Sequence, residues 1–521
     1  MPRSPAPRAI AIATTVFFVV YLLIGLVAFK DYGISWDEIP TREFGVMNVE
    51  HVVPDLHALD SLRAAKGPNF ERFGPLYEIV LVRMEKALGL GNLRAVFLMR
   101  HLVTFLTFYL GVVLFHALCR RRFSAGISLL ACLCLVASPQ LFSHSFYNTK
   151  DVSFLTAFVA VMLTLDVLLE RPEWRSLAIH ALTSGLLMGT RILGLFAMML
   201  TGVAALARRP TLKMLGMLVV YGIAVALILP VVWPVLRIDP IGIVKDAILH
   251  STTNPYGKAN LFRGAMVPAT ALPWDYVPTW ILITTPYVIS ALFAVGAVRS
   301  VTALARHPRE FFVGDRQRDL IVMSWFFLPV VGCMVLRPVL YDGWRHLFFV
   351  YPAMIYLAAV GMETILHAAN ARWGGAQYEW LQPALTAALV IALMPGVSFM
   401  YRNHPFEHLY FNRFAGKDML EVKQRYELDY WGLSYRQLLE YIVRSDSSPV
   451  IRVHTANFPG MVNSIMLRPA DQRRVRFVPP SEYADYFITN YRFHPEQYQW
   501  TNEVFSVRVG NASAASVFRL K

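Results

Sequence analysis

The chain has 521 residues, of which 56% are hydrophobic, and its mean hydropathy is +0.44. This is too apolar for a soluble domain, and apolar runs of about 20 residues, enough to cross a hydrocarbon core, recur along the sequence. The net charge of +14 does not indicate nucleic-acid binding, because the basic residues gather in short loops between apolar runs. Membrane topology and anionic lipid headgroups explain that distribution.

We predict a polytopic α-helical membrane protein with about eleven spans. The first run, Ala9 to Phe29, is too long for a signal-peptide core and lacks a cleavage site, so we expect it to be retained. Residues 189–191, Gly-Thr-Arg, interrupt one apolar stretch and separate the fifth span from the sixth. The predicted spans are residues 9–29, 96–118, 126–142, 152–169, 176–189, 192–207, 214–236, 279–304, 320–337, 346–366 and 382–400.

The basic residues favour a cytoplasmic amino terminus under the positive-inside rule. In that orientation the short outer loops hold only Lys150, Arg191, Arg337 and Arg345. The inner segments hold many more, namely Arg3, Arg8, Arg120, Arg121, Arg122, Arg171, Arg175, Arg208, Arg209, Lys213, Arg306, Arg309, Arg316, Arg318 and Arg372. Each outer cation therefore needs a separate explanation.

Two outer loops are long. Residues 30–95 carry mixed apolar and charged stretches, which we interpret as helices lying in the membrane interface with Arg72, Arg83 and Lys86 on a wet face. Residues 237–278 are rich in Pro, Gly, Asn and Thr, which predicts a loop. This loop ends in Leu-Pro-Trp-Asp-Tyr, where Trp274 and Asp275 suit either an interfacial aromatic belt or a sugar-binding platform.

The composition becomes polar after residue 400, which divides the chain into a membrane module, 1–400, and a tail, 401–521. Helical spacing runs from Tyr435 to Arg444. The tail also contains apparent strands at 450–454, 475–478 and 486–489, and a closing hairpin at 504–509 and 516–520 around Gly510-Asn511. We predict a small α/β domain, which an odd number of spans places outside the cytoplasm.

A pair of carboxylates follows the first span in the motif Ser35-Trp36-Asp37-Glu38. One interpretation is two solvated acids in an interfacial loop. The other is a catalytic pair at the outer end of a helix bundle, where a general base accepts the proton of an acceptor hydroxyl. In that case Asp37 and Glu38 divide the work, one as base and one orienting the acceptor or a metal, and Trp36 contacts the substrate.

A second motif, Tyr147-Asn148-Thr149-Lys150-Asp151, fills the turn between the third and fourth spans. Asn148, Thr149 or Asp151 is suited to cap the helix that follows, and an acid in the first turn favours the macrodipole. Capping does not explain Lys150, because a cation opposes that dipole. A cation beside exposed helix amides makes an anion site suited to phosphate. Asp151 is a second candidate catalytic acid, with Tyr147 and Asn148 as substrate contacts.

The other outer cations extend this site. Arg191 lies in the outer turn between the fifth and sixth spans, and Arg345-His346 opens the tenth. Each is either an interfacial anchor or, together with Lys150, part of a cradle for a lipid-linked phosphate, since Arg binds phosphate bidentately and stays charged. Arg337 ends a span and needs only to snorkel, so we leave it out.

No cofactor is firmly indicated. A divalent metal held by Asp37 and Asp151, with His144 or His346 as a further ligand, is an open alternative, although no tight ligand spacing supports it. The sequence contains neither a phosphate-binding Gly-rich loop ending in Gly-Lys-Ser/Thr nor a His-Glu-x-x-His motif, so ATP hydrolysis and zinc proteolysis lack support.

The motifs in this order resemble the GT-C glycosyltransferases. Residues 34–38, 147–151 and 341–346 are similar to motifs of bacterial relatives of the protein O-mannosyltransferases and the aminoarabinose transferase. Residues 427–435, Glu-Leu-Asp-Tyr-Trp-Gly-Leu-Ser-Tyr, are similar to a stretch in family 39-like bacterial members. The resemblance implies a polyprenyl-phosphate sugar donor, with Asp37 and Asp151 as the acids of the first and second outer loops. The chain lacks the large lumenal repeat domain of the eukaryotic mannosyltransferases.

We therefore expect an inverting glycosyltransferase of a bacterial inner membrane. It would move a sugar from a polyprenyl phosphate to a hydroxyl of a glycan, lipid or protein acceptor on the periplasmic side, where the carboxy-terminal domain lies. The alternative from another class is a transporter or flippase of lipid-linked sugars, which needs gates on both sides and often two matching halves with interrupted helices. The polar motifs lie on one side only, which favours the enzyme.

Overall fold

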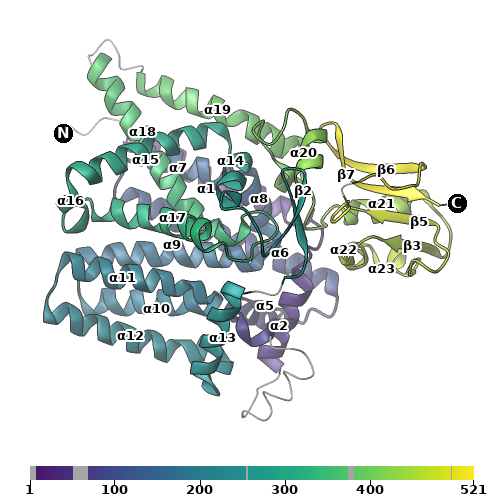
Figure 1. Ribbon diagram of the computed structural model, residues 1–521, viewed down its shortest axis with the longest axis horizontal. Helices are drawn as coiled ribbons and strands as arrows, with labels where there is room; N and C mark the ends of the chain where they lie inside the picture. Colours follow the sequence, from purple (N-terminus) through teal and green to yellow (C-terminus); the bar gives the residue numbers. More distant parts are fainter. Residues whose placement is uncertain (1–6, 51–68, 254–255, 374–380, 495, 521) are drawn as a thin grey trace.

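The computed structural model describes residues 7–50, 69–253, 256–373, 381–494 and 496–520. Within them the chain forms a body of long helices with a sheet domain at one end (Figure 1). Each predicted span overlaps one or two of the observed helices. The long helices are α1 (Pro7–Ala28), α6 (Leu93–Arg120), α9 (Thr149–Glu170), α10 (Trp174–Thr190), α11 (Leu195–Arg208), α12 (Leu212–Val232), α15 (Tyr287–Arg306), α17 (Gln317–Leu336), α18 (Tyr351–Trp373) and α19 (Leu381–Asn403).

The protein is a multi-pass membrane protein. Eight helices in the described part of the chain are long and apolar enough to cross a membrane, or nine if one bent pair counts as a single span. Several of them expose large apolar side chains, such as Leu227 on α12, which is 71% exposed, as lipid contact requires. The predicted fifth and sixth spans correspond to α10 and α11, which have 17 and 14 residues and are shorter than a full span.

Two predicted spans are broken in the structure. Residues 126–142 form α7 (Ala125–Val136) and α8 (Pro139–Tyr147), which are bent by 68°. Residues 279–304 form most of α14 (Tyr276–Thr284) and α15, with Pro286 at the junction. Proline lacks a backbone N–H and disfavours helical geometry in the residue before it. Pro139 and Pro286 therefore stand where a new helix begins. The sequence stays apolar across both breaks, so hydropathy alone does not predict them.

The first long outer loop is largely helical, as predicted. It contains α2 (Glu38–Glu50), α4 (Asn69–Arg72) and α5 (Leu76–Ala87), and α2 packs against α5. Arg83 is exposed, Arg72 pairs with Asp246 and Lys86 with Glu50. Residues 51–68 of this predicted loop lie outside the described residues, as does Arg3.

The second long outer loop has more structure than its composition predicted. Residues 237–278 contain α13 (Pro240–Thr253) and a hairpin of β1 (Ala259–Phe262) and β2 (Ala265–Pro268). Ile243 and Ala247 of α13 are buried with Trp233, which packs at the end of α12. This tertiary contact stabilises a helix that the surrounding Pro, Gly and Asn residues obscure in the sequence.

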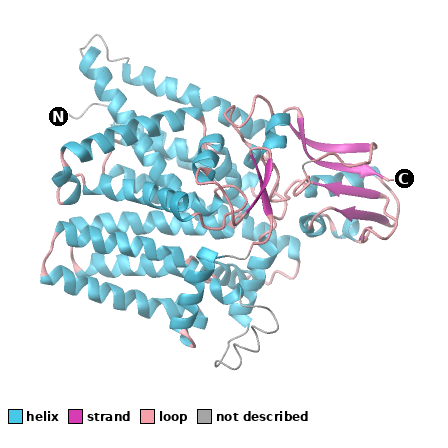
Figure 2. Ribbon diagram, viewed as in Figure 1, coloured by secondary structure: helices cyan, strands magenta, loops and turns pink. Residues whose placement is uncertain are grey.

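The carboxy-terminal domain is built as predicted around a mixed sheet. Its strands are ordered β4-β3-β5-β7-β6, with β3 parallel to β4 and β5, and β7 antiparallel to β5 and β6. Figure 2 shows the strands of this sheet at one end of the helical body. Helix α21 (Tyr435–Ser445) packs on it with one apolar side. The strands are β3 (Ile451–Thr455), β4 (Val475–Phe477), β5 (Tyr486–Thr489), β6 (Glu503–Val509) and β7 (Ala512–Arg519).

The composition changes at residue 400, but the chain does not leave the helical body there. Helix α19 continues to Asn403, and the segment after it runs back along the other helices. Gln140 on α8 donates to the His408 carbonyl at 2.7 Å, and Asn412 donates to the carbonyls of Leu282 and Thr285. Residues 404–434 therefore connect the membrane helices to the sheet domain through buried polar contacts.

The sheet domain is tied directly to the chain that follows the first span. The buried Asn463 side chain accepts a hydrogen bond from Ile34 N–H at 2.8 Å and donates to the Ile34 carbonyl at 3.0 Å. Trp36 N–H donates to the Trp431 carbonyl at 3.0 Å. The tail thus sets the position of the segment that carries Asp37.

Candidate active site

A buried arginine with carboxylate partners on three sides forms the centre of the charged cluster. Arg345 Nη1 lies 3.0 Å from Asp37 Oδ2 and 3.5 Å from Asp151 Oδ2. Its Nη2 lies 3.3 Å from Asp342 Oδ2. The Arg345 side chain is 2% exposed, whereas that of Asp37 is 35% exposed. Because Asp151 and Asp342 are buried, Asp37 is the carboxylate of this cluster that a substrate reaches most easily.

Local backbone geometry aims two of these carboxylates at Arg345. Asp342 and Gly343 have φ of 58° and 70°, so the chain turns sharply and Asp342 faces Arg345 three residues later. Asp and Gly are residue types that tolerate this left-handed region. Asp151 stands in the first turn of α9, where Asn148 accepts from its backbone N–H at 3.1 Å and donates to its Oδ2 at 2.8 Å. Asn148 is thus the cap of this helix.

The other outer cations surround the same carboxylates. Arg191 Nη1 is 2.9 Å from Asp151 Oδ1, so Arg191 and Arg345 contact the two oxygens of one carboxylate. Lys150 Nζ lies 3.5 Å from the centre of the Phe73 ring and within electrostatic range of Arg191 and Arg345. The His346 ring packs edge-on against Tyr341. In the part of the chain described, His346 Nδ1 has no hydrogen-bond partner.

A close backbone contact positions Lys150 and Arg191 together. A Cβ atom on Gly74 would lie 2.5 Å from the Gly189 carbonyl oxygen, so only glycine lets residue 74 approach the end of α10 this closely. Phe73, which lies under Lys150, is the neighbour of Gly74. The outer loop and the Gly189-Thr190-Arg191 turn are therefore held in direct contact.

The tail contributes an arginine that the sequence did not reveal. Arg492 is buried and forms an ion pair with Asp342, and it also donates to the Tyr430 carbonyl. Its guanidinium lies 4.6 Å from the centre of the Trp36 ring, a cation–π distance. The core of the site then has three carboxylates, Asp37, Asp151 and Asp342, and four cations, Lys150, Arg191, Arg345 and Arg492.

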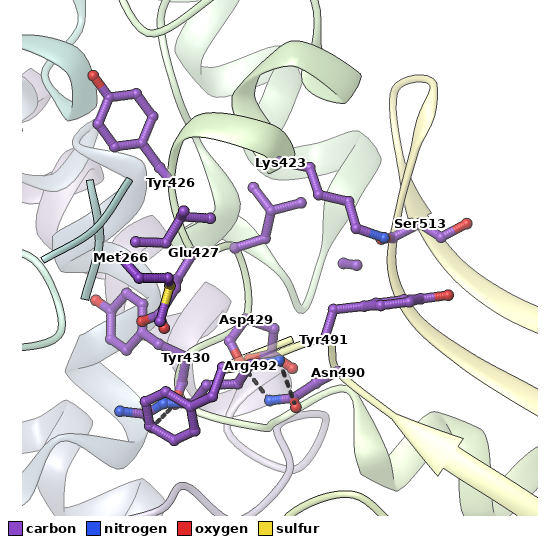
Figure 3. A pocket seen from close by; sticks show the side chains of 14 residues that line it. Met266, Lys423, Tyr426, Glu427, Asp429, Tyr430, Asn490, Tyr491, Arg492 and Ser513 are labelled. Carbon is purple, nitrogen blue, oxygen red and sulfur yellow. Dashed lines mark hydrogen bonds between the residues drawn. The ribbon is translucent and has the colours of Figure 1, made fainter. Parts of the chain in front are cut away.

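Arg492 also lines a cavity of about 20 Å³ between the sheet domain and the β1–β2 hairpin (Figure 3). Glu427 lies in this cavity, where its Oε1 is shielded from solvent and has no hydrogen-bond partner within the described ranges. Burial raises the pKa of the Glu427 carboxyl to about 7, against an opposing effect of the Arg492 charge. Burial likewise raises the pKa of the Asp342 carboxyl, with Arg492 and Arg345 opposing it.

Several predicted site residues lie elsewhere. Glu38 does not pair with Asp37 in a shared site: it is buried, accepts from Ser35 N–H at 2.6 Å, and contacts His101 Nε2 at 2.9 Å. This anchors the start of α2, so the idea that the two adjacent acids share the chemistry has no geometric support. Tyr147 is buried beneath Trp431.

The predicted sugar platform also stands apart from the cluster. Trp274 is 55% exposed, and Asp275 pairs with Arg263 at 2.6 Å on the hairpin side of the second outer loop. Trp36, in contrast, lies at the cluster, with Arg492 on one side and Lys258 5.2 Å from its ring centre. Of the aromatic candidates, Trp36 is the one next to the charged groups.

The residues proposed for a metal do not form a metal site. In the described ranges, no three His, Cys, Asp or Glu side chains are arranged to hold a metal ion. The Arg345 guanidinium occupies the position between Asp37 and Asp151. His144 instead accepts from Asn148 at 2.9 Å and contacts Trp431. The carboxylates of the cluster are neutralised by guanidinium groups.

Glu427 predicts a pH dependence of stability. Its folded pKa of about 7 lies above the ordinary 4.5, so its favourable contribution is complete below about pH 4.5 and is lost as the pH rises through 7. The full loss corresponds to about 3 kcal/mol. We expect the unfolding temperature of the purified protein to fall between pH 5 and pH 8, and Glu427→Gln to reduce that fall. Glu482→Gln, at an exposed position of the same domain, is the control. An equal fall in wild type and Glu427→Gln would contradict the assignment.

The chain is similar to known proteins in part of its sequence and in its fold. The family model for dolichyl-phosphate-mannose-protein mannosyltransferase matches residues 88–236. A comparison with curated proteins gave no match. The fold is similar to that of ArnT from Cupriavidus metallidurans in the apo state, at 13% identity and a TM-score of 0.50, over 97% of this chain and 98% of that chain.

Two further structures are similar at slightly lower scores. ArnT bound to undecaprenyl phosphate gives 14% identity and a TM-score of 0.49, over 96% of this chain and 97% of that one. The oligosaccharyltransferase from Archaeoglobus fulgidus in the apo form gives 11% and 0.48, over 88% of this chain and 64% of that one. The family match covers under a third of the chain, and the likeness to ArnT shows that the chain has the same fold.

Proposed function

We propose that this chain is an inverting glycosyltransferase that moves a sugar from a polyprenyl phosphate to an acceptor hydroxyl at the outer membrane surface. The observation that carries the proposal is the cluster around Arg345, where the accessible carboxylate of Asp37 adjoins more cations than carboxylates. An excess of cations beside a carboxylate base suits a donor whose leaving group is a phosphate. The acceptor is a glycan, a lipid or a protein.

In the proposed reaction the acceptor oxygen attacks the anomeric carbon while its proton passes to Asp37. The bond between the anomeric carbon and the phosphate oxygen breaks on the opposite face, and polyprenyl phosphate leaves with the electron pair. A phosphate leaving group needs charge stabilisation more than protonation, so one base suffices, whereas a glycosidase needs a second acid. Asp151 holds Arg191 and Arg345 in place and is a positioning residue.

The base is tested by Asp37→Asn, which keeps the size of the side chain and removes its basicity. We expect transfer from a labelled polyprenyl-phosphate sugar to fall by at least about 100-fold, the low end for general base catalysis, with donor binding largely retained. Asp471→Asn, a carboxylate of the sheet domain that pairs with Arg474, is the control and keeps full activity. Near-normal turnover of Asp37→Asn would refute the assignment, and vectorial movement of the donor without bond cleavage would indicate a transporter.

We assign the donor phosphate to Lys150, Arg191 and Arg345, with His346 beside them. Replacing Lys150 or Arg191 with Ala should weaken binding of both the sugar donor and bare polyprenyl phosphate, since both carry the anion. Each lost charged contact should cost roughly 1.5–3 kcal/mol, about 10- to 150-fold in affinity. Arg345→Ala should in addition abolish turnover, because it leaves buried carboxylates unpaired.

The matched control is Arg337→Gln, an exposed cation at the same end of the bundle, where α17 ends. Titration of labelled polyprenyl phosphate in detergent measures all four variants. Unchanged affinity in both Lys150→Ala and Arg191→Ala would rule out this phosphate site.

We also propose a bacterial inner membrane location with a cytoplasmic amino terminus and a periplasmic sheet domain. The support is the excess of basic residues in the segments at the opposite end of the bundle. A reporter that is active only in the cytoplasm, fused after Lys521, should give no signal, whereas one fused after Arg209 should be active. A strong signal from the first fusion would reverse the orientation.

A further inference from the structure

A second charged cavity lies at the other end of the helical body. It has a volume of about 400 Å³ and is lined by Arg122, Arg299, Arg316, Asp319, Glu363 and His367. The cluster around Arg345 is where α1 and α10 end and α9 and α18 begin. The cavity is where α6 and α18 end and α17 begins, so it lies at the opposite membrane surface. Helix α16 (Pro308–Phe312), which covers it, lies far from the sheet domain (Figure 1).

The three arginines of this cavity differ in how their charge is used. Arg122 binds Glu363 through both Nη atoms, at 3.2 and 2.9 Å, and its Nε lies 3.5 Å from Asp319. Arg122 is therefore shared by two acids, and the three side chains form a fixed wall of the cavity. With one guanidinium against two carboxylates, this wall has no excess of positive charge.

Arg299 and Arg316 make the lining net positive, because with Arg122 it has three guanidinium groups against the carboxylates of Asp319 and Glu363. Within the described ranges, Arg299 is exposed and has no carboxylate partner. Arg316 reaches Glu310 only at 3.5 Å, and the Glu310 side chain is 54% exposed. Such an exposed pair is weak and readily gives way to a stronger anion. Two guanidinium groups of one cavity are thus available to bind the same anion.

The surroundings of the cavity are apolar, although its lining is polar. Val298 and Val301, next to Arg299 on α15, are 67% and 50% exposed, and Phe312 and Val313 beside α16 are 48% and 54% exposed. Large exposed apolar side chains at the end of a membrane helix contact acyl chains. The charged part of a ligand in this cavity would thus lie among the arginines, next to apolar side chains that contact the hydrocarbon.

We propose that the cavity between α15, α16, α17 and α18 binds the phosphodiester headgroup of an anionic phospholipid, with Arg299 and Arg316 on the phosphate oxygens. Guanidinium groups pair with phosphate bidentately, and basic pockets between membrane helices bind anionic headgroups. The flanking valines and Phe312 favour a lipid over a free phosphate, which would gain nothing from them. The site is separate from the proposed transfer reaction and would act on the stability of the helical body.

The test is lipid binding by the full-length protein in detergent, followed by the rise in unfolding temperature and by the count of lipids retained in native mass spectrometry. A ligand that binds only the folded state stabilises it by RT ln(1 + L/Kd), where L is the free lipid concentration, so a weaker site needs proportionally more lipid for the same rise. Phosphatidylglycerol should stabilise the wild type at concentrations where phosphatidylcholine does not. The double variant Arg299→Gln, Arg316→Gln should need at least about 10-fold more phosphatidylglycerol for the same rise. Arg175→Gln, an exposed cation at the same membrane surface, should behave as wild type.

Two outcomes would overturn the proposal. One is a double variant that responds to phosphatidylglycerol as the wild type does. The other is full competition by inorganic phosphate at the concentration of the lipid, which would make the ligand a soluble phosphate. If the double variant unfolds without lipid, Arg299→Gln alone gives the same test with a smaller shift. This side chain is exposed and pairs with no carboxylate among the described residues, so its loss should not unfold the protein.

Discussion

The arrangement of this protein depends on one buried cation, the guanidinium of Arg345. Removing an arginine from water costs several kcal/mol unless its charge is matched, and removing a partner of such a pair typically costs about 3–5 kcal/mol. Its partners Asp37, Asp151 and Asp342 come from the first outer loop, the start of α9 and the turn before α18. These segments must come together around Arg345 for its charge to be matched. The same requirement brings the proposed base, a helix amino terminus and several cations to one place.

The sheet domain is part of this arrangement and not an appendage. Asn463 satisfies both backbone polar groups of Ile34, which is three residues before Asp37. Arg492 forms an ion pair with the carboxylate of Asp342, whose other oxygen lies near Arg345. The domain therefore acts on the cluster through the backbone of the first outer loop and through a chain of charges. Displacement of the sheet would disturb Asp37 and Asp342 at once.

The two membrane surfaces of the helical body use arginine differently. At the end that carries the sheet domain, the guanidinium groups of Arg345 and Arg492 are buried and paired with carboxylates, which fixes their positions. At the other end Arg299 and Arg316 are accessible, and one weak, exposed acid is the partner found for the pair in the described chain. The first arrangement holds charged groups in fixed positions, whereas the second leaves guanidinium groups open to a ligand.

The sequence alone determined the features that depend on local chemistry. Apolar runs marked the long helices of the described chain, since hydropathy is summed over neighbours along the sequence, and alternating residues marked the strands of the tail. Asp37, Asp151, Arg191 and Arg345 stood out because charge is costly beside a bilayer.

The tertiary structure decided what depends on distant partners. Arg492 meets Asp342 across 150 positions, and no periodicity records such a pair. Glu38 looked equal to Asp37 until its contact with His101 was known. The helix at 240–253 forms because Ile243 and Ala247 are covered by Trp233, and the bend between α7 and α8 lies within one continuous apolar run. A local sequence pattern reflects how each residue contacts solvent and its neighbours along the chain. These four features depend instead on residues that come into contact only in the folded chain.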